Sequence, residues 1–250
     1  MGLYIEAFIR ADLDDLWTRT QEPSQHQRWD LRFTEIDYLP RTEGEPQRFR
    51  YATRVLPFLT IAGTGISAGE KERPDGTRTS ALRFASRHPL SLLAEGSGYW
   101  RYVPDGDGVR FLTGYDYRPR WGAFGALVDR LILRPLMGWA TAWSFDRLRL
   151  WLERGITPER ALLNWLAEMA VRALTLTLAA TALLKASSLA LFGPFAPTMA
   201  FVYPLFLTLA ICAALLKSPL ACTPAARRCL RTPPTRAGAP RVLRTLKELS

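Results

Sequence analysis

The chain has 250 residues, of which 48% are hydrophobic and 22% charged, and its formal net charge at pH 7 is +10. This length allows one or two domains. Residues 217–250 hold eight Lys or Arg side chains and one acid, which leaves the rest of the chain near neutral. With no basic face outside this segment, the composition argues against nucleic-acid binding. A basic stretch beside an apolar segment instead favours contact with an anionic membrane surface.

Cysteine and histidine are few and widely spaced. All three cysteines, Cys212, Cys222 and Cys229, come late in the chain, and the two histidines, His26 and His88, are far apart. No disulfide framework and no metal-ligand spacing follows from this pattern. We therefore expect no metal and no cofactor.

The N-terminal part predicts a strand over Leu3–Ile9 followed by two short helices. Asp12 precedes the first helix, over residues 13–20, where a carboxylate caps free backbone N–H groups. The second helix starts around Pro23 and ends near Trp29. Alternating or β-rich patterns then predict strands over residues 31–39, 47–55, 60–72 and 77–86. Gly63-Thr64-Gly65 is not followed by a helix, so we interpret these residues as strand glycines rather than as a phosphate loop.

A β-hairpin that leads into one long helix follows. Residues 98–103 and 109–117 are rich in aromatic and β-branched side chains, and the segment 104–108, PDGDG, separates them as a turn. The helix over residues 122–153 would be about 45 Å long, enough to cross a small sheet. Pro135 removes a helical hydrogen bond, so the helix should bend or divide there. This order of elements predicts an α+β domain whose long helix lies across an antiparallel sheet.

This order resembles the START-like superfamily, which is also called SRPBCC, polyketide-cyclase-like or helix-grip. The resemblance covers residues 1–154. It rests on ADLDDLW at residues 11–17, on the helix that ends at Trp29, on the hairpin, and on FDRLRLWLE at residues 145–153. It implies a helix-grip domain with a hollow for an apolar ligand between the sheet and the long helix.

The apolar side chains expected on the hollow are the candidate ligand-binding residues. They are Phe49, Tyr51, Phe84, Tyr99, Phe111, Tyr115, Leu127, Leu131 and Phe145. The alternative is that they only fill the core. No residue is predicted to be catalytic, because the acids lie at caps and turns and Asp116 forms at most an ordinary cross-strand pair with Arg101 or Arg110.

The character of the chain changes at residues 155–159, where a Gly-Ile-Thr-Pro-Glu sequence marks a domain boundary. Residues 195–216 carry no charge and would span about 33 Å as a helix, against about 30 Å for a hydrocarbon core. Residues 171–192 predict another span, and Gly193-Pro194 a turn between the two. We therefore predict a membrane region with two transmembrane helices over residues 155–217 and a flexible basic tail over residues 218–250.

The charges around these spans predict their orientation. The loop between them is uncharged and the tail is basic, so the tail should be cytoplasmic. Two crossings place the N-terminal domain on the same side, and the first 17 residues lack the basic region of a signal peptide. We expect a multi-pass protein of the inner (cytoplasmic) membrane.

The membrane region also resembles DoxX-like proteins. Arg172, the apolar run after it and Leu183-Leu184-Lys185 are similar to their "R…GLxxK" first span. The whole layout resembles a bacterial group in which a START-like domain is fused to a DoxX-like membrane tail. Trp139, Trp143 and Trp151, in the half of the long helix nearest this region, could pack on the sheet or contact the bilayer interface, where Trp is favoured.

Three functions remain open from the sequence. The first is a membrane-anchored module that binds a lipid or another apolar small molecule, with the membrane as a partner. The second is a cyclase-type or hydrolase-type enzyme for an apolar substrate, and the third is an accessory subunit of a membrane redox complex. A buried ionisable cluster facing the hollow would favour the enzyme.

Overall fold

The computed structural model describes residues 2–41, 45–56, 59–192 and 197–233. The chain divides into two compact units. The first unit combines Met1–Glu159 with Ala225–Ser250, and the second unit is Arg160–Pro224. The chain therefore leaves the first unit once and returns to it.

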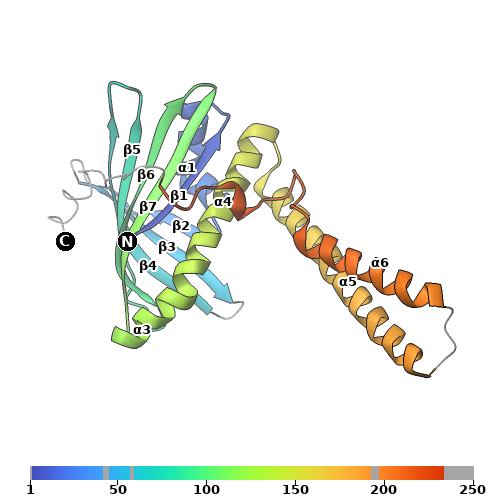
Figure 1. Cartoon of the computed structure of the whole chain (residues 1–250). Helices are drawn as coiled ribbons and strands as arrows, with labels where there is room; N and C mark the ends of the chain where they lie inside the picture. Colours follow the sequence, from blue (N-terminus) through green and yellow to red (C-terminus); the bar gives the residue numbers. More distant parts are fainter. Residues whose placement is uncertain (1, 42–44, 57–58, 193–196, 234–250) are drawn as a thin grey trace. The chain divides into compact units, whose positions relative to one another are not determined.

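The first unit is built on a seven-stranded antiparallel sheet with the strand order β1-β7-β6-β5-β4-β3-β2 (Figure 1). The first strand thus pairs with the last, and the remaining strands follow as a meander. The strands are β1 (Leu3–Ile9), β2 (Glu35–Tyr38), β3 (Gln47–Leu56), β4 (Leu59–Glu72), β5 (Arg78–Ala85), β6 (Leu93–Asp105) and β7 (Gly108–Pro119).

Two short helices, α1 (Leu13–Gln21) and α2 (Pro23–Trp29), connect β1 to β2. The Asp12 carboxylate caps α1 as predicted, because its Oδ1 accepts a hydrogen bond of 2.8 Å from the Asp14 N–H. The long helix α4 (Arg134–Arg154) packs on the sheet beside β1. The buried rings of Phe145 on α4 and Phe111 on β7 stack with centroids 4.4 Å apart. The α+β class and the sheet closed by a long helix match the expected helix-grip fold.

The predicted division of the long helix at Pro135 is present. A first segment, α3 (Gly122–Val128), leads into a π-helical turn, η1 (Asp129–Leu133), and then into α4. Pro135 has no N–H to donate to the preceding turn, and the Arg134 N–H bonds to the Asp129 carbonyl oxygen five residues back. This wider turn changes the phase of the helix, since it inserts residues relative to α-helical spacing.

The phase change corrects one prediction about the ligand site. Leu127 and Leu131 were expected to face the sheet, but their side chains are 55% and 65% exposed. Gly125 and Asp129 are the buried residues of this part of the helix. Leu127 and Leu131 therefore do not line a hollow between helix and sheet.

Trp143 and Trp151 are buried in the first unit, which argues against contact of these two rings with a bilayer, and Trp139 is half-buried. The Trp151 ring also lies beneath two guanidinium groups, those of Arg19 at 4.0 Å and Arg28 at 4.6 Å from its centroid. Cation–π contacts of this kind stabilise a partly covered aromatic ring.

The segment after the apolar helices is not a loose tail at its start, which corrects the boundary predicted at residue 218. Ala225, Ala226 and Cys229 are buried, and Leu230 exchanges two backbone hydrogen bonds of 2.9 Å with Glu6 on β1. The short helix η2 (Ala226–Arg228) packs against α4. The predicted tail beyond residue 233 lies outside the described residues.

The second unit consists mainly of two apolar helices, α5 (Pro158–Phe192) and α6 (Pro197–Leu216). Arg172 joins them, since its guanidinium pairs with Glu168 at 2.6 Å and donates to the Ala214 and Lys217 carbonyl oxygens at the end of α6. A cation at a helix C-terminus also interacts favourably with the helix dipole.

Among the described residues one helix, Pro158–Lys185, is long and apolar enough to cross a membrane, and Tyr203–Leu216 is a shorter apolar helix. Leucine side chains at Leu174, Leu178 and Leu209 are more than half exposed. The turn predicted at Gly193-Pro194 lies outside the described residues.

Candidate ligand site

A group of aromatic rings lies on the face of the sheet that carries Phe111 and α4, over strands β2 to β5. We call this group, which consists of Phe33, Tyr38, Phe49, Tyr51 and Phe84, the aromatic row. The Tyr51 ring is at its centre, with centroids 5.6 Å from Phe33 and 6.4 Å from both Phe49 and Phe84. Phe33, Tyr51 and Phe84 are only half-buried. The row is therefore an apolar surface that the fold leaves partly open.

Glycines on the neighbouring strands shape this surface. Phe49 lies directly across from Gly65, and Tyr51 lies across from Gly63. A methyl group at Gly65 would lie 2.2 Å from the Phe49 ring, and one at Gly63 would lie 2.4 Å from the Tyr51 hydroxyl. The rings thus cover the space that a neighbouring side chain would fill. Phe84 stands in the same relation to Gly96.

This pairing explains the glycines in β4. They permit close approach by a ring from the next strand, which is one of the established uses of glycine in a sheet. The sequence predicted strand glycines here, but it did not indicate that each one is matched by an aromatic residue.

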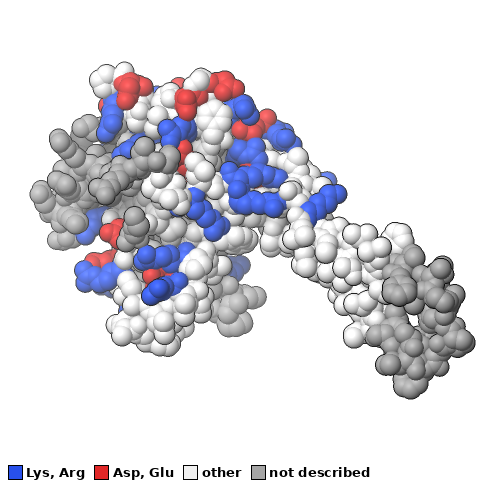
Figure 2. All heavy atoms as spheres, in the orientation of Figure 1, with Lys and Arg blue, Asp and Glu red and all other residues white. Residues whose placement is uncertain are grey.

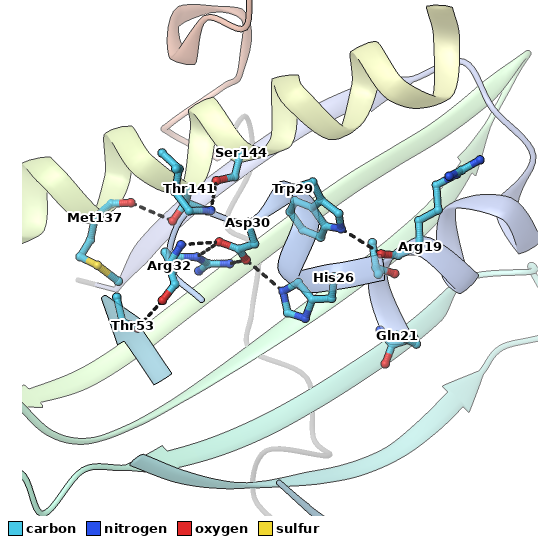
Figure 3. Close-up of polar contacts among 12 residues, drawn as sticks. Arg19, Gln21, His26, Trp29, Asp30, Arg32, Thr53, Met137, Thr141 and Ser144 are labelled. Carbon is cyan, nitrogen blue, oxygen red and sulfur yellow. Dashed lines mark hydrogen bonds and ion pairs between the residues drawn. The ribbon is translucent and has the colours of Figure 1, made fainter. Parts of the chain in front are cut away.

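A buried group of charged side chains lies beside Phe33 of the aromatic row, since the centroids of the His26 and Phe33 rings are 5.3 Å apart. Figure 3 shows this group. His26 Nε2 is 3.0 Å from Asp30 Oδ2, and both oxygens of Asp30 accept hydrogen bonds from the Arg32 guanidinium, at 2.9 and 2.6 Å. The Arg32 guanidinium also lies 4.7 Å from the centroid of the Tyr115 ring. All three side chains are at most 10% exposed.

The surrounding backbone fixes this His26–Asp30–Arg32 cluster. The Leu31 N–H donates to Ser144 Oγ on α4 at 2.9 Å, and Thr53 Oγ1 on β3 donates to the Arg32 carbonyl oxygen. These bonds hold the chain after α2 in an irregular path. For this reason β2 begins at Glu35 and not at residue 31, where the alternating pattern predicted a strand.

Burial and pairing set the charges of the cluster. Burial alone would raise the pKa of Asp30, but the Arg32 charge and the hydrogen bonds from Arg32 and His26 outweigh it and hold that pKa well below its usual range. Burial lowers the pKa of His26 more than Asp30 raises it. The cluster therefore consists of a neutral imidazole beside a carboxylate–guanidinium ion pair.

Sequence reasoning missed this cluster, since it found no partner for His26. The available signals were the spacing of His26 and Asp30, four residues apart across a helix end, and the Asp-Leu-Arg alternation. A buried ion pair of this kind is satisfied only with several hydrogen bonds in place, and those come from segments distant in sequence.

The structure separates the nine predicted ligand residues. Phe49, Tyr51 and Phe84 come together in the aromatic row. Phe111 and Phe145 are fully buried in the core, and Tyr115 lies against Arg32. The other three do not belong to this face.

Tyr99, like Leu127 and Leu131, was predicted to line the ligand site and does not. It packs with Tyr4, Ala81 and Leu112 in a small cluster on the opposite face of the sheet. The register places Trp100 and Tyr102 across from Thr113 and Phe111, and alternation then turns Tyr99 away.

A cavity of about 570 Å³ lies at the end of the sheet nearest the β5–β6 and β7–α3 connections. Its lining includes residues of β3 to β7, among them Thr64, Ile66 and Ser97. Its charged lining comes from the face opposite α4, by the strand alternation, and comprises Arg48, Arg83, Glu95, Asp116 and Arg118. Strands β3 to β7 are continuously paired here, so the cavity does not pass through the sheet. It is a polar hollow on the face opposite α4, separate from the aromatic row.

The described part of the chain contains no candidate metal site. No group of three or more His, Cys, Asp or Glu side chains there could hold a metal ion.

These observations define the class of the chain: an α+β domain of the helix-grip type, completed by a returning C-terminal segment and joined to a pair of apolar helices. No protein-family model matches the sequence. Among curated proteins, the uncharacterised membrane protein YndG of Bacillus subtilis (strain 168) is 49% identical over 159 residues. This match spans 63% of the present chain and 59% of the relative.

Solved structures with a similar backbone include a STAR-related lipid transfer protein from Xanthomonas axonopodis, at 19% identity and TM-score 0.45, over 60% of this chain and 84% of that one. Another is the Zhui aromatase/cyclase from Streptomyces sp. R1128, at 15% identity and TM-score 0.39, over 59% and 95% of the two chains. At such identities and scores these similarities carry no statement about chemistry.

Proposed function

We propose that this protein is a membrane-attached module whose first unit binds a lipid or another apolar small molecule on the aromatic row. The observation that carries this proposal is that Phe33, Tyr51 and Phe84 stay half-open on the core-facing side of the sheet. A ligand site of this type is mostly apolar, with few polar groups that fix orientation. The half-buried Tyr51 hydroxyl, whose pKa burial raises to about 12, stays protonated and can donate a hydrogen bond.

Membrane attachment is the second part of the proposal. The composition of α5 supports it, as does the exposure of leucines along both apolar helices. The curated relative is described as a membrane protein. A lipid ligand and a bilayer anchor fit each other, because a domain held near a membrane can exchange lipid with it.

The return of Ala225–Leu230 to the first unit supports a topology in which both ends of the chain lie on the same side of the membrane. Residues on both sides of the apolar helices fold into the first unit. A folded unit lies on one side of a membrane, so any crossing by α5 is matched by a crossing back. We propose two crossings, with both ends on the cytoplasmic side, in keeping with the basic residues of the C-terminal segment.

The experiment that tests ligand binding uses the full chain, because Ala225–Leu230 belongs to the first unit. The chain is purified in detergent, and bound molecules are identified by native mass spectrometry and organic extraction. We expect a stoichiometric apolar molecule in the wild type. A folded protein that retains none and takes up no fluorescent fatty-acid or phospholipid probe would contradict the proposal.

A matched pair of variants locates the site. Tyr51 and Tyr99 each lie across from a glycine, on opposite faces of the sheet. We expect Tyr51→Ala to lower ligand occupancy several-fold per folded molecule, and Tyr99→Ala to leave it unchanged. Equal losses in both variants would mean that the aromatic row is not the site.

The His26–Asp30–Arg32 cluster favours a second candidate, an enzyme of the cyclase or hydrolase type. His26 is the uncharged member that can accept a proton, since Asp30 and Arg32 hold each other in their charged forms. In that case the extracted molecule should change on incubation with wild-type protein and not with His26→Gln. An extracted molecule that is chemically unchanged supports binding alone.

A further inference from the structure

We propose that the exposed face of α3 and the π-helical turn lies on the surface of an anionic lipid bilayer. The inference rests on the proposed membrane attachment and adds a second contact to it. The face, which we call the apolar belt, consists of the side chains of Trp121, Phe124, Leu127, Leu131, Ile132 and Leu136.

The apolar belt is unusually open for large side chains. Phe124 and Leu131 are each 65% exposed, and Ile132 is 60% exposed. In soluble proteins, contiguous apolar surface of this kind marks a contact with a partner or a membrane. In Figure 2 the end of the first unit where Figure 1 labels α3 is largely uncharged, with basic and some acidic residues beside it.

The small residues of the segment hold it against the domain and thereby turn the large ones outward. A methyl group at Gly125 would lie 1.6 Å from the Arg120 carbonyl oxygen, so the helix can approach that backbone only with glycine there. Trp121 and Gly122 both have positive φ angles, of 68° and 55°. Left-handed backbone is unfavourable for a Trp, and here it sets the direction in which α3 begins.

The charge of the segment is complementary to anionic headgroups. Its acid, Asp129, is buried and accepts a hydrogen bond of 2.6 Å from the Tyr117 hydroxyl, while Arg134 pairs with it at 3.2 Å. The guanidinium of Arg130 is exposed beside the belt. The outward charge of residues 121–136 is therefore positive.

An exposed apolar stripe of Trp, Phe and Leu flanked by arginine is the pattern of an interfacial helix, which buries its apolar face at the headgroup boundary. Each nearby Lys or Arg adds to the attraction toward an anionic surface. A second copy of the chain fits less well, since a two-fold contact would bring Arg130 and Arg134 from both copies together.

The test measures the depth of the belt directly. The full chain, with Cys212 and Cys222 replaced by serine, receives a spin label at Phe124→Cys or Leu131→Cys. The control label is at Asp107→Cys, in the turn between β6 and β7 at the other end of the sheet, where the side chain is 73% exposed. The variants are placed in phosphatidylcholine vesicles that contain phosphatidylglycerol. We expect labels at residues 124 and 131 to be reached by oxygen and shielded several-fold from a water-soluble nickel chelate, unlike the label at residue 107.

Further outcomes separate the alternatives. Arg130→Glu should raise nickel access at residue 131 several-fold, by repulsion from the anionic lipid. The inference would be overturned if the nickel chelate reached residue 131 as easily as residue 107. Spin–spin broadening between labels at residue 131 would also overturn it, because that broadening indicates a second copy. Flotation with the vesicles separates the two proposals. If the chain floats but its belt labels stay accessible to nickel, only this inference is contradicted. If the chain does not float, the proposed membrane attachment is contradicted.

Discussion

The carboxylate of Asp146, in the middle of α4, accepts a hydrogen bond of 2.7 Å from the backbone N–H of Ala225. The two residues are separated by 79 positions and by both apolar helices. Asp146 is fully buried and also pairs with Arg149 at 2.7 Å and Arg228 at 2.8 Å. One carboxylate thus holds the returning segment in the first unit.

Asp146→Asn should release this segment. It removes the charge that holds Arg149 and Arg228, and breaking a buried ion pair destabilises by about 3–5 kcal/mol. Cys229 reports the release, because its thiol is buried, donates to the Ala142 carbonyl oxygen at 3.2 Å, and has a pKa that burial raises to about 12. We expect Cys229 to react with a maleimide at least tenfold faster in the variant.

The control for this change is Glu95→Gln. Its ion pair with Arg118 is exposed on both sides, and surface pairs contribute about 0–1 kcal/mol. If Cys229 reacts equally slowly in Asp146→Asn and in the control, Asp146 does not hold the segment.

The two ends of the chain should lie on the same side of the membrane. Short epitope tags at the N-terminus and after residue 250 are tested in sealed spheroplasts and in inverted vesicles. Because the first unit contains both flanks of the apolar helices, we expect protease to remove both tags in inverted vesicles and neither in spheroplasts. Removal of one tag in each preparation would require a single crossing, and the return of Ala225–Leu230 would then be wrong.

Gly65→Ala should destabilise the first unit by about 1–3 kcal/mol, the usual range for an overpacked site. The added methyl group meets the Phe49 ring at 2.2 Å. Urea titration of the full chain in detergent measures the change, followed by tryptophan fluorescence, since seven of the eight tryptophans precede residue 160. The double variant with Phe49→Leu should recover part of the loss, and strict additivity of the two changes would argue against the ring–glycine contact.

Stability should fall in mild acid because of His26. Burial holds the pKa of its folded form below the usual value, so the unfolded chain binds more protons as pH drops through about 6.5. The stabilising contribution is therefore complete above that pH and is lost below it, at up to about 1.4 kcal/mol per pH unit. His26→Gln should reduce the slope between about pH 7 and pH 5.

His88→Gln provides the comparison, since it changes the other histidine of the chain. We expect this variant to keep the wild-type slope. A slope that is the same in His26→Gln and in the wild type would show that another group causes the acid sensitivity.

Local patterns were sufficient for most elements of the first unit. The strand over Leu3–Ile9, the Asp12 cap, the end of α2 at Trp29 and the break before Pro135 follow from side-chain alternation, capping chemistry and the missing proline N–H. These causes act within a few residues of one another, so a single sequence contains them. The same holds for the apolar character of α5 and α6.

The face of the sheet or helix on which a side chain lies could be assigned only from the tertiary structure. The turn of the last hairpin involves Gly106 and Asp107, since Asp105 pairs with Gly108. The sequence PDGDG permits several turns, and a shift of one residue reverses the face of every side chain in a strand. That ambiguity put Tyr99 on the wrong face. The π-helical turn had the same effect on Leu127 and Leu131.

The sequence by itself therefore determined the α+β class, the order of the elements and the presence of two apolar helices. The tertiary structure decided three things: which aromatics stay half-open, that His26, Asp30 and Arg32 meet, and that Ala225–Leu230 returns to α4 and β1. Each of these depends on groups far apart in the chain. The periodicity of a segment reports its own backbone and its apolar face, and it does not contain the identity of the residues that will lie against that face.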